Sequence, residues 1–465
     1  MTFLIALFAL AALVWLLPLL RTRRTLHVAT LVLVTGTLFG PPFFSIVGPI
    51  QFSLDRVLWV AMLALVAVRW RCGDLKLPPL HRVDCLLASL VVWLFISAAM
   101  GTSDPQNDAP PLAKWCFYIA MPFGMYAVAR VSEIKESDLR WVYRVVLGLG
   151  VYLAWTAILE VAGFHRLVFP RHIVDPQDWE FFGRARGPLL NPSGNAIVMC
   201  VALVISAHGT LRSTPRMRLL HALLSLVILV GVYCTLTRSA WLGALVTLAV
   251  VAFVYSPRWL RVLGLAAAIL LGAAAALELK DQLLRLDRDK NLTAADAEKS
   301  IQLRPLLAVV AWEMFKDHPI RGHGFGQYDR LSGKYHSIRS YDLPLEDARP
   351  YTQHNVLLAL LVESGLIGLS LWVGVLLIIS SMAWHLARNP DRSVALRGGG
   401  MLWLGTVAAY LCNGMFQDVT IIPMVNMYLF FAAGIAVTLY DRGVETRRVE
   451  AARPSATLAH LPIPQ

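Results

Sequence analysis

The sequence predicts an all-α fold: a polytopic helical membrane protein of about 12–13 transmembrane helices with one large helical periplasmic loop. Apolar residues make up 57% of the chain and charged residues only 15%, against about 25% in ordinary globular domains. The apolar residues form blocks of about 17–25 residues, long enough for helices to cross a hydrocarbon core of ~30 Å. The net charge of +12 comes from basic residues in the connections between blocks, which favours membrane orientation over nucleic-acid binding as its cause.

Thirteen apolar blocks are candidate membrane spans. In chain order they are residues 2–20, 26–46, 54–70, 83–101, 114–130, 141–163, 190–208, 217–235, 239–256, 259–277, 354–384, 397–416 and 422–440. The first block has neither a basic segment before it nor a small-residue cleavage site, so we expect a retained helix rather than a cleaved signal peptide.

The blocks divide the chain into five predicted regions. Residues 1–163 hold the N-terminal transmembrane helices, and residues 164–277 hold the central transmembrane helices with arginine motifs on their outer face. Residues 278–353 form the large periplasmic loop, and residues 354–440 hold the C-terminal transmembrane helices. Residues 441–465 are expected to be a disordered cytoplasmic tail.

Lysine and arginine gather in alternate connections. They are Arg21, Arg23 and Arg24; Arg69, Arg71, Lys76 and Arg82; Arg212, Arg216 and Arg218; Arg258 and Arg261; Arg388, Arg392 and Arg397; and Arg442, Arg447 and Arg448. The positive-inside rule makes their side of the membrane cytoplasmic. The opposite connections at 46–53, 101–111 and 417–421 carry no basic residue, so we expect the N-terminus and the loop at 279–353 to lie outside.

The loop at 279–353 is longer than a connector needs, since loops beyond about 15 residues are usually functional or disordered. Apolar residues recur at helical spacing over 301–316, which predicts a helix there. The Asp287-Arg-Asp289 pattern matches the minimal DxD of metal-dependent sugar-nucleotide transferases, but on this side of the membrane we interpret it as solvated surface. None of the six cysteines lies in the loop or forms a CxxC pair, so neither a disulfide framework nor a zinc site is indicated.

Two arginine clusters lie at the outer ends of spans. Arg184 and Arg186 precede a turn-rich stretch where a span begins, and they could be interfacial side chains or cations over the mouth of a helix bundle. Arg238 lies in a link of a few residues between two apolar spans, where positive-inside bias selects against arginine. Because an arginine near membrane depth usually has a partner or a function, we favour a functional role for Arg238.

The loop and the next span add polar groups on the same face. Arg304 lies in the predicted helix, Arg321 lies in the glycine-rich turn after it, and His354 opens the span at 356–384. A lone histidine at a helix start is more often an interfacial residue than a catalyst, but this one shares a face with the arginines. Glu363 lies about 180° from His354 around a straight helix, so its expected role is packing against another helix.

These residues belong to four short motifs. In order they are Arg186-Gly187-Pro-x-x-Asn191-Pro192, Leu236-Thr-Arg238-Ser239-Ala-Trp241, Arg304…Trp312…His318-Pro319-x-x-Gly322-x-Gly324, and His354-Asn355…Glu363-x-Gly365-Leu366-Ile367-Gly368. In this order, around a large outer loop, they resemble the O-antigen ligase/polymerase superfamily of bacterial envelopes over roughly residues 180–375. The flanking helices match only in being hydrophobic.

The resemblance implies a membrane glycosyltransferase at the periplasmic face of the bacterial inner (cytoplasmic) membrane. Members join a glycan from an undecaprenyl-diphosphate carrier to an acceptor hydroxyl on lipid A-core, on another repeat unit or on a protein side chain. The implied partners are that lipid-linked donor, an acceptor glycan or lipid A-core, and membrane lipids, with other polysaccharide-assembly proteins as a further option. No nucleic acid, metal, nucleotide sugar or cofactor is implied.

The chemistry of the residues agrees with the resemblance. The leaving diphosphate gains negative charge in the transition state, and fixed guanidinium groups stabilise it well because their planar fork binds phosphate oxygens in pairs. The acceptor hydroxyl needs a base, and neutral histidine is suited near pH 7. We therefore expect the catalytic base of an inverting, metal-independent transfer to be His354. The expected diphosphate-binding residues are Arg186, Arg238 and Arg304, and the expected secondary contacts are Arg321 and Asn355.

Two other classes of function remain open. A transporter or flippase of lipid-linked glycans would have charged or broken helices near the membrane midplane, whereas most predicted spans carry no charge there. A non-catalytic component of a polysaccharide export complex would leave the arginines and the histidine as coincidence. The sequence does not choose between ligase, polymerase and protein glycosyltransferase.

Overall fold

A computed structural model of the chain describes residues 24–46, 52–102, 109–178, 180–277, 294–349 and 351–452. The predicted first span, the Asp287-Arg-Asp289 pattern and the last part of the predicted tail lie outside the described residues.

Every predicted span after the first coincides with a helix or with a run of short helices. The single helices are α2 (Thr25–Phe39), α3 (Leu54–Arg71), α4 (Arg82–Ala99), α7 (Glu136–Val161), α8 (Pro192–Arg212), α9 (Pro215–Cys234), α10 (Arg238–Tyr255), α11 (Arg258–Leu277), α15 (Val356–Arg388), α16 (Val394–Gly414) and α17 (Pro423–Ala452). The span predicted at 114–130 is divided into α5 (Pro111–Trp115), the π-helical η1 (Cys116–Ala120) and α6 (Met121–Val131). Within the described residues, nine helices are long and apolar enough to cross a membrane. The predicted polytopic helical fold is confirmed.

The remaining described elements are short, apart from one long helix outside the spans. These elements are the two-residue antiparallel strands β1 (Ser45–Ile46) and β2 (Phe52–Ser53), the 3-10 helices η2 (His165–Leu167), η3 (Arg171–Val174), η4 (Ser332–Ser337), η5 (Leu345–Ala348) and η6 (Val419–Ile421), the helical turn α14 (Tyr328–Leu331), and the long helix α13 (Ala294–Asp317). The helix predicted at 301–316 is therefore present as α13, with longer bounds.

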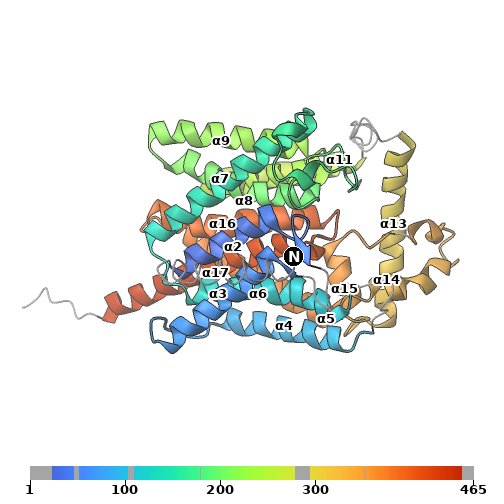
Figure 1. The fold of residues 1–465 in the computed structure, drawn as a ribbon, viewed down its shortest axis with the longest axis horizontal. Helices are drawn as coiled ribbons and strands as arrows, with labels where there is room; N and C mark the ends of the chain where they lie inside the picture. The colour runs from blue at the N-terminus through green and yellow to red at the C-terminus, as the bar shows by residue number, and fades with distance from the viewer. Residues whose placement is uncertain are drawn as a thin grey trace, which may run out of the picture.

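The spanning helices form a bundle with α13 lying across one end of it (Figure 1). We call that end the α13 end. The helix α8 lies at the centre, with 89% of its apolar window buried, whereas only 22% of the window of α9 is buried. Since apolar side chains of an outer helix can face lipid, this difference indicates that α9 lies on the perimeter of the bundle.

The segment around α13 has an apolar core of its own. Side chains from α13, η4 and η5 bury one another and pack on Val362 of α15. Members of this cluster include Leu306, Val310, Met314, Tyr335 and Leu345. Because the segment of α13, η4 and η5 has an apolar core of its own, it is an ordered part of the α13 end and not an unstructured loop.

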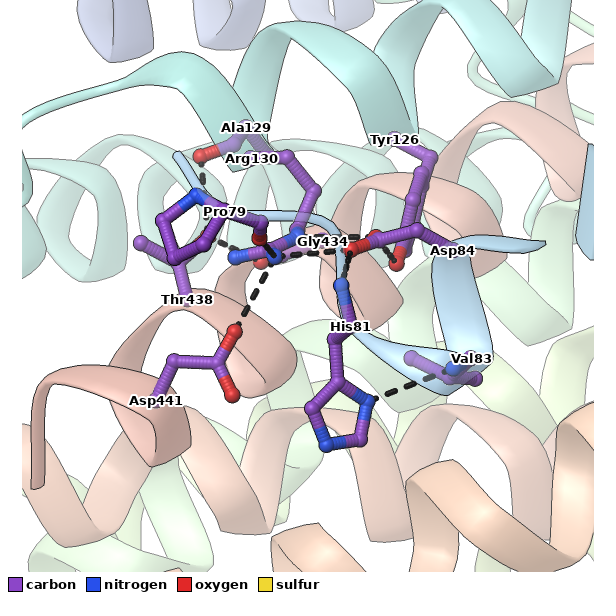
Figure 2. Close-up of polar contacts among 10 residues, drawn as sticks. All are labelled: Pro79, His81, Val83, Asp84, Tyr126, Ala129, Arg130, Gly434, Thr438 and Asp441. Carbon is purple, nitrogen blue, oxygen red and sulfur yellow. Dashed lines mark hydrogen bonds and ion pairs between the residues drawn. The ribbon is translucent and has the colours of Figure 1, made fainter. Parts of the chain in front are cut away.

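A network of buried polar groups joins three helices at the opposite end of the bundle (Figure 2). Arg130 of α6 lies between Asp84 of α4 and Asp441 of α17, with nitrogen–oxygen distances of 2.8 and 3.0 Å. Tyr126 donates its hydroxyl hydrogen to Asp84 from the preceding turn of α6. The Arg130 side chain is only 5% exposed, so salt screens these pairs weakly and they hold the three helices together.

Close packing of α6 against α17 accompanies this network. A Cβ atom at Gly434 would lie 2.6 Å from the carbonyl oxygen of Tyr126, so only glycine fits there. Thr438 donates its hydroxyl hydrogen to the Ala129 carbonyl at 3.2 Å. Small residues let helices approach in this way within a membrane.

Candidate functional site

The connection between α7 and α8 shapes the short link before α10. Arg184, which is 7% exposed, donates its Nε hydrogen to the Thr235 carbonyl at 3.3 Å. The Ala185 N–H donates to the Cys234 carbonyl at 3.1 Å. Leu236 turns the link with a φ of 48°, a left-handed conformation that is rare outside glycine. These contacts place Arg238 at the α13 end.

Arg186 lies inside the connection between α7 and α8 rather than at an open surface. Its side chain is fully buried, and its guanidinium donates to four backbone carbonyls. These acceptors belong to Ile173, Asp175, Asp178 and Glu180. Because a guanidinium has five N–H donors, Arg186 has little capacity left for phosphate. Its hydrogen bonds support a role in folding this connection, and its contact with diphosphate stays a prediction.

Arg238, Arg304 and His354 come from three separate segments and lie together at the α13 end. Arg238 is the first residue of α10, Arg304 lies on α13, and His354 comes two residues before α15. Partial burial, and then the positive charge of Arg238, lower the pKa of Arg304. The Arg304 guanidinium carbon also lies 5.3 Å from the centre of the Phe416 ring, beyond the end of α16. Three of the predicted site residues therefore share one electrostatic environment.

The N-terminus of α10 begins at this cluster. Thr237, the residue before α10, makes no capping hydrogen bond with its side chain. Its hydroxyl donates to the Thr235 carbonyl at 2.9 Å and accepts a hydrogen bond from Arg184. The first N–H groups of a helix carry partial positive charge and bind anions readily. Together with Arg238 they make this corner electropositive.

His354 has a backbone conformation that few residues adopt. Its φ is 44°, and outliers of this kind outside glycine are frequent at functional sites. Burial, and then the charge of Arg304, lower the pKa of His354 below its usual value of 6.5. The described residues form no hydrogen bond with its ring, and the ring of Tyr351 lies 6.4 Å away between centres. A neutral imidazole in this position can accept a proton near pH 7.

Asn355 caps α15. Its Oδ1 accepts hydrogen bonds from the N–H groups of Leu357 and Leu358 at 2.9 and 3.1 Å. Its Nδ2 donates to the carbonyl of Met415 at 3.2 Å, which joins the start of α15 to the end of α16. Asparagine is a preferred residue at this helix position because it pairs with the N–H groups that the helix leaves open. These bonds support a positioning role for Asn355 beside His354.

Gln353, the residue before His354, is hydrogen-bonded to Asp418. The sequence did not single out either residue as a site residue. The Gln353 Nε2 donates to Asp418 Oδ2 at 3.4 Å, and Thr420 donates its N–H to Asp418 Oδ1 at 3.0 Å. Burial, against the hydrogen bonds from Thr420, raises the pKa of Asp418 to about 6. The one available signal was that Asp418 is the sole charge in an outer link. No sequence signal pointed to Gln353.

The third and fourth motifs dock on each other. The helix α15 is interrupted at Gly365, which has a φ of 64° and a ψ of −167°, and the turn after α13 pairs with the interruption. The backbone hydrogen bonds run from His323 to Val362 (2.8 Å), Gly324 to Glu363 (3.0 Å), Leu366 to Pro319 (2.9 Å) and Ile367 to Ile320 (3.2 Å). Glu363 therefore takes part in packing, both against this turn and against α4, whose Ser97 donates its hydroxyl hydrogen to the Glu363 carbonyl at 3.3 Å.

Arg321 lies apart from the other arginines. It lines a separate cavity of about 230 Å³ between that turn and α4, with Trp93, His318 and His323 among the other lining residues. The electrostatic interactions that link Arg238, Arg304 and His354 do not include Arg321. Its secondary contact with substrate stays a prediction. Among the described residues, no three His, Cys, Asp or Glu side chains are grouped so that they could hold a metal ion.

Comparisons with known proteins bear on the part of the chain that holds these groups. Residues 223–373, about a third of the chain, match a family model described as O-Antigen ligase. The segment includes Arg238, Arg304 and His354 but not Arg186, and over this range the predicted resemblance is confirmed.

One solved structure, described as "Structural coordination of polymerization and crosslinking by a peptidoglycan synthase complex", is similar to this chain with 16% identity and a TM-score of 0.35. The match covers 77% of this chain and 96% of that chain. No curated protein matches the chain significantly.

Proposed function

We propose that this chain, whose residues 223–373 match the O-antigen ligase family model, is a membrane glycosyltransferase that moves a glycan from an undecaprenyl-diphosphate carrier to an acceptor hydroxyl. The observation that carries the proposal is the shared electrostatic environment of Arg238, Arg304 and His354. Two guanidinium groups beside a neutral imidazole match what a diphosphate leaving group and a hydroxyl nucleophile require.

The proposed reaction is a single displacement. The acceptor oxygen forms a bond to the anomeric carbon of the donor sugar while its proton passes to a ring nitrogen of His354. The bond from the anomeric carbon to the diphosphate oxygen breaks, and that oxygen keeps the electron pair. Attack opposite to the leaving group inverts the configuration at the anomeric carbon.

Arg238 and Arg304 are assigned to the diphosphate. Their charges repel each other in the structure. A bound anion between them would offset this repulsion. The partial positive charge at the start of α10 adds to theirs. In this proposal guanidinium groups supply the positive charge that a metal supplies in other transferases, so the reaction is metal-independent.

His354 is assigned as the base. Its lowered pKa favours the neutral form at neutral pH, which is the form that can take the proton of the acceptor. Hydrogen bonds of Asn355 and Gln353 hold the chain on either side of it. Because the positions of these neighbours are fixed, the imidazole needs little reorganisation before it reacts.

The roles of the other predicted residues are assigned from their contacts. Arg186 holds the connection between α7 and α8, and through Arg184 that connection supports the link before Arg238. Asn355 is assigned as a positioning residue, and Arg321 is assigned to a more distant part of the glycan. The α13 end is assigned to the periplasmic face of a bacterial inner membrane, since the basic connections lie at the other end.

The interruption of α15 is a feature that the transporter alternative also predicts. The four backbone hydrogen bonds from the turn after α13 fill this interruption, so its polar groups face protein. Broken helices that line a transport path leave such groups open to substrate or ions. This difference favours the transferase.

The test is transfer by the purified, full-length chain in lipid, with an undecaprenyl-diphosphate glycan and a defined acceptor. We expect His354→Ala to lower turnover by at least about 100-fold, in line with loss of a general base. His165→Ala is the matched control, because His165 is exposed in the connection between α7 and α8. Turnover by His354→Ala at the wild-type rate would refute the assignment. Donor movement across the membrane without transfer would support the transporter instead.

A further inference from the structure

A cavity at the end of the bundle opposite α13 is lined by arginines. It has a volume of about 600 Å³ and lies between the end of α15, the link to α16 and the last part of α17. Arg258, Arg388 and Arg392 line it, and His385 and Asp391 also belong to the lining. Trp384, Leu439 and Tyr440 form part of its apolar wall.

Two arginines, Arg388 of the cavity lining and Arg261 outside it, lie near the same aromatic ring. The guanidinium carbons of Arg261 and Arg388 lie 5.7 and 5.4 Å from the centre of the Trp384 ring. Arg392 lies against α17, since a Cβ atom at Gly443 would be 2.8 Å from its Nη2. Arginines that only reach for water from a membrane helix would spread apart. Arg258, Arg388 and Arg392 instead line one cavity.

The gathered charges repel one another. Arg258, Arg388 and Arg392 line the same cavity, and like charges held close together repel. The ion pairs among the described side chains include none of Arg258, Arg261, Arg388 and Arg392. Asp391 is the only acid in the described lining of the cavity. The excess of positive charge indicates an anionic ligand.

The apolar surface beside the cavity indicates what else the ligand carries. Val262 and Leu263 of α11 are 67% and 58% exposed, and Leu377 of α15 is 66% exposed. On a spanning helix such side chains face acyl chains. Tryptophan is frequent at the level of the headgroups, which suits Trp384. The site therefore joins a cationic cavity to a lipid-facing apolar surface.

We propose that this cavity binds the phosphate headgroup of an anionic phospholipid, with Arg258, Arg388 and Arg392 around the phosphate and the acyl chains along α11 and α15. Basic pockets between helix ends on the cytoplasmic side of a membrane are suited to such headgroups. The site lies at the end opposite His354 and is independent of the proposed transfer reaction.

The test compares lipid binding by two variants with the same change in net charge. One carries Arg258→Gln, Arg388→Gln and Arg392→Gln. The control carries Arg71→Gln, Arg216→Gln and Arg218→Gln, three exposed arginines at the same end. Binding of phosphatidylglycerol and of phosphatidylcholine to the delipidated full chain is measured by native mass spectrometry. The cavity variant should lose about 100-fold in affinity for phosphatidylglycerol, or about fivefold for each arginine.

The control variant should stay within about threefold of the wild type, and neither protein should prefer phosphatidylcholine. Equal losses in both variants, or no preference of the wild type for phosphatidylglycerol, would overturn the proposal. Competition by inorganic phosphate at the same concentration as the lipid would also overturn it, because the acyl chains would then contribute nothing. If the triple variant folds poorly, the affinity for phosphatidylglycerol is measured on the single variant Arg258→Gln, at the exposed start of α11, which should lose about fivefold.

Discussion

At the scale of single residues, the proton affinity of His354 depends on a neighbour from another segment. Burial and the charge of Arg304 lower its pKa from the usual 6.5. A histidine with a lowered pKa stays neutral down to a lower pH. Protonation removes its ability to act as a base. The Arg304 side chain therefore does two things in the proposed site: it binds phosphate and it keeps the base available.

Replacing Arg304 by Gln should move the acid limb of the pH profile. Loss of the positive charge lets the pKa of His354 rise, so transfer should fail at a higher pH than in the wild type. The measurement is kcat/KM for transfer between pH 5 and pH 8. The pH at the midpoint of this profile reports the pKa of the base, whereas the height of the profile reports the rate that remains when the base is neutral. In the wild type the midpoint should lie below 6.5. Arg339→Gln, which breaks an exposed pair with Glu346, should leave the midpoint in place. An unmoved midpoint in the Arg304 variant would show that its charge does not act on the base.

Replacing Arg238 by Lys should reduce transfer although the charge is kept. Lysine cannot bind two phosphate oxygens with one planar group, and loss of a fixed donor to a developing negative charge costs about 100-fold in rate. Turnover is measured with saturating donor, and Arg339→Lys is the matched control. Wild-type turnover by Arg238→Lys would leave Arg238 as an interfacial side chain only.

At the scale of elements, the interruption of α15 depends on one glycine. A Cβ atom at Gly365 would lie 2.3 Å from the carbonyl oxygen of Ile320, and the residue has a φ of 64°. An L side chain meets both a clash and a strained backbone there. Since the turn after α13 pairs with this point, the position of α13 and therefore of Arg304 depends on it.

Gly365→Ala should detach the turn from α15. The expected loss of stability is at least about 2 kcal/mol, from the strained backbone alone, and the segment between α13 and α15 should become sensitive to protease. Thermal unfolding and limited proteolysis are the measurements. Gly374→Ala, in the same helix, is the control, because a Cβ there would meet only a leucine methyl at 3.2 Å. This variant should change thermal unfolding and protease sensitivity little. A resistant, stable Gly365→Ala protein would contradict the docking.

At the scale of the whole molecule, charged groups are arranged differently in the proposed substrate site and in the network around Arg130. At the α13 end, positively charged groups lie close enough to repel each other, as the proposed substrate site requires. Around Arg130 at the opposite end, buried charges are paired across three helices (Figure 2). The paired network stabilises the bundle, and the cluster of positive groups is assigned to the proposed substrate site.

Arg130→Ala should destabilise the bundle without touching the α13 end. Removing one partner of a buried network leaves its carboxylates uncompensated, at a cost of about 3–5 kcal/mol. Arg140→Ala is the control, because its pair with Glu136 is 59% and 40% exposed and should contribute at most about 1 kcal/mol. The midpoint of thermal unfolding in detergent measures both. Equal midpoints would show that the Arg130 network does not hold the helices.

The sequence by itself determined the spans and the residue types of the site. Blocks long enough to cross a membrane must be helical, because no water is present to pair with their backbone groups. This requirement is local, so the bounds of α4 or α10 could be predicted within a few residues. Arg238 could be singled out for the same kind of reason, since its charge conflicts with its place in the chain.

Only the tertiary structure decided which of these residues lie together. Arg186 and Arg238 look alike in the sequence, yet one guanidinium is taken up by carbonyls of its own connection and the other lies beside Arg304. Gln353 and Asp418 are 65 residues apart and meet through the packing of the ends of α15 and α16. Side-chain hydrogen bonds between distant segments depend on how the helices pack, and one sequence carries no local signal for that packing.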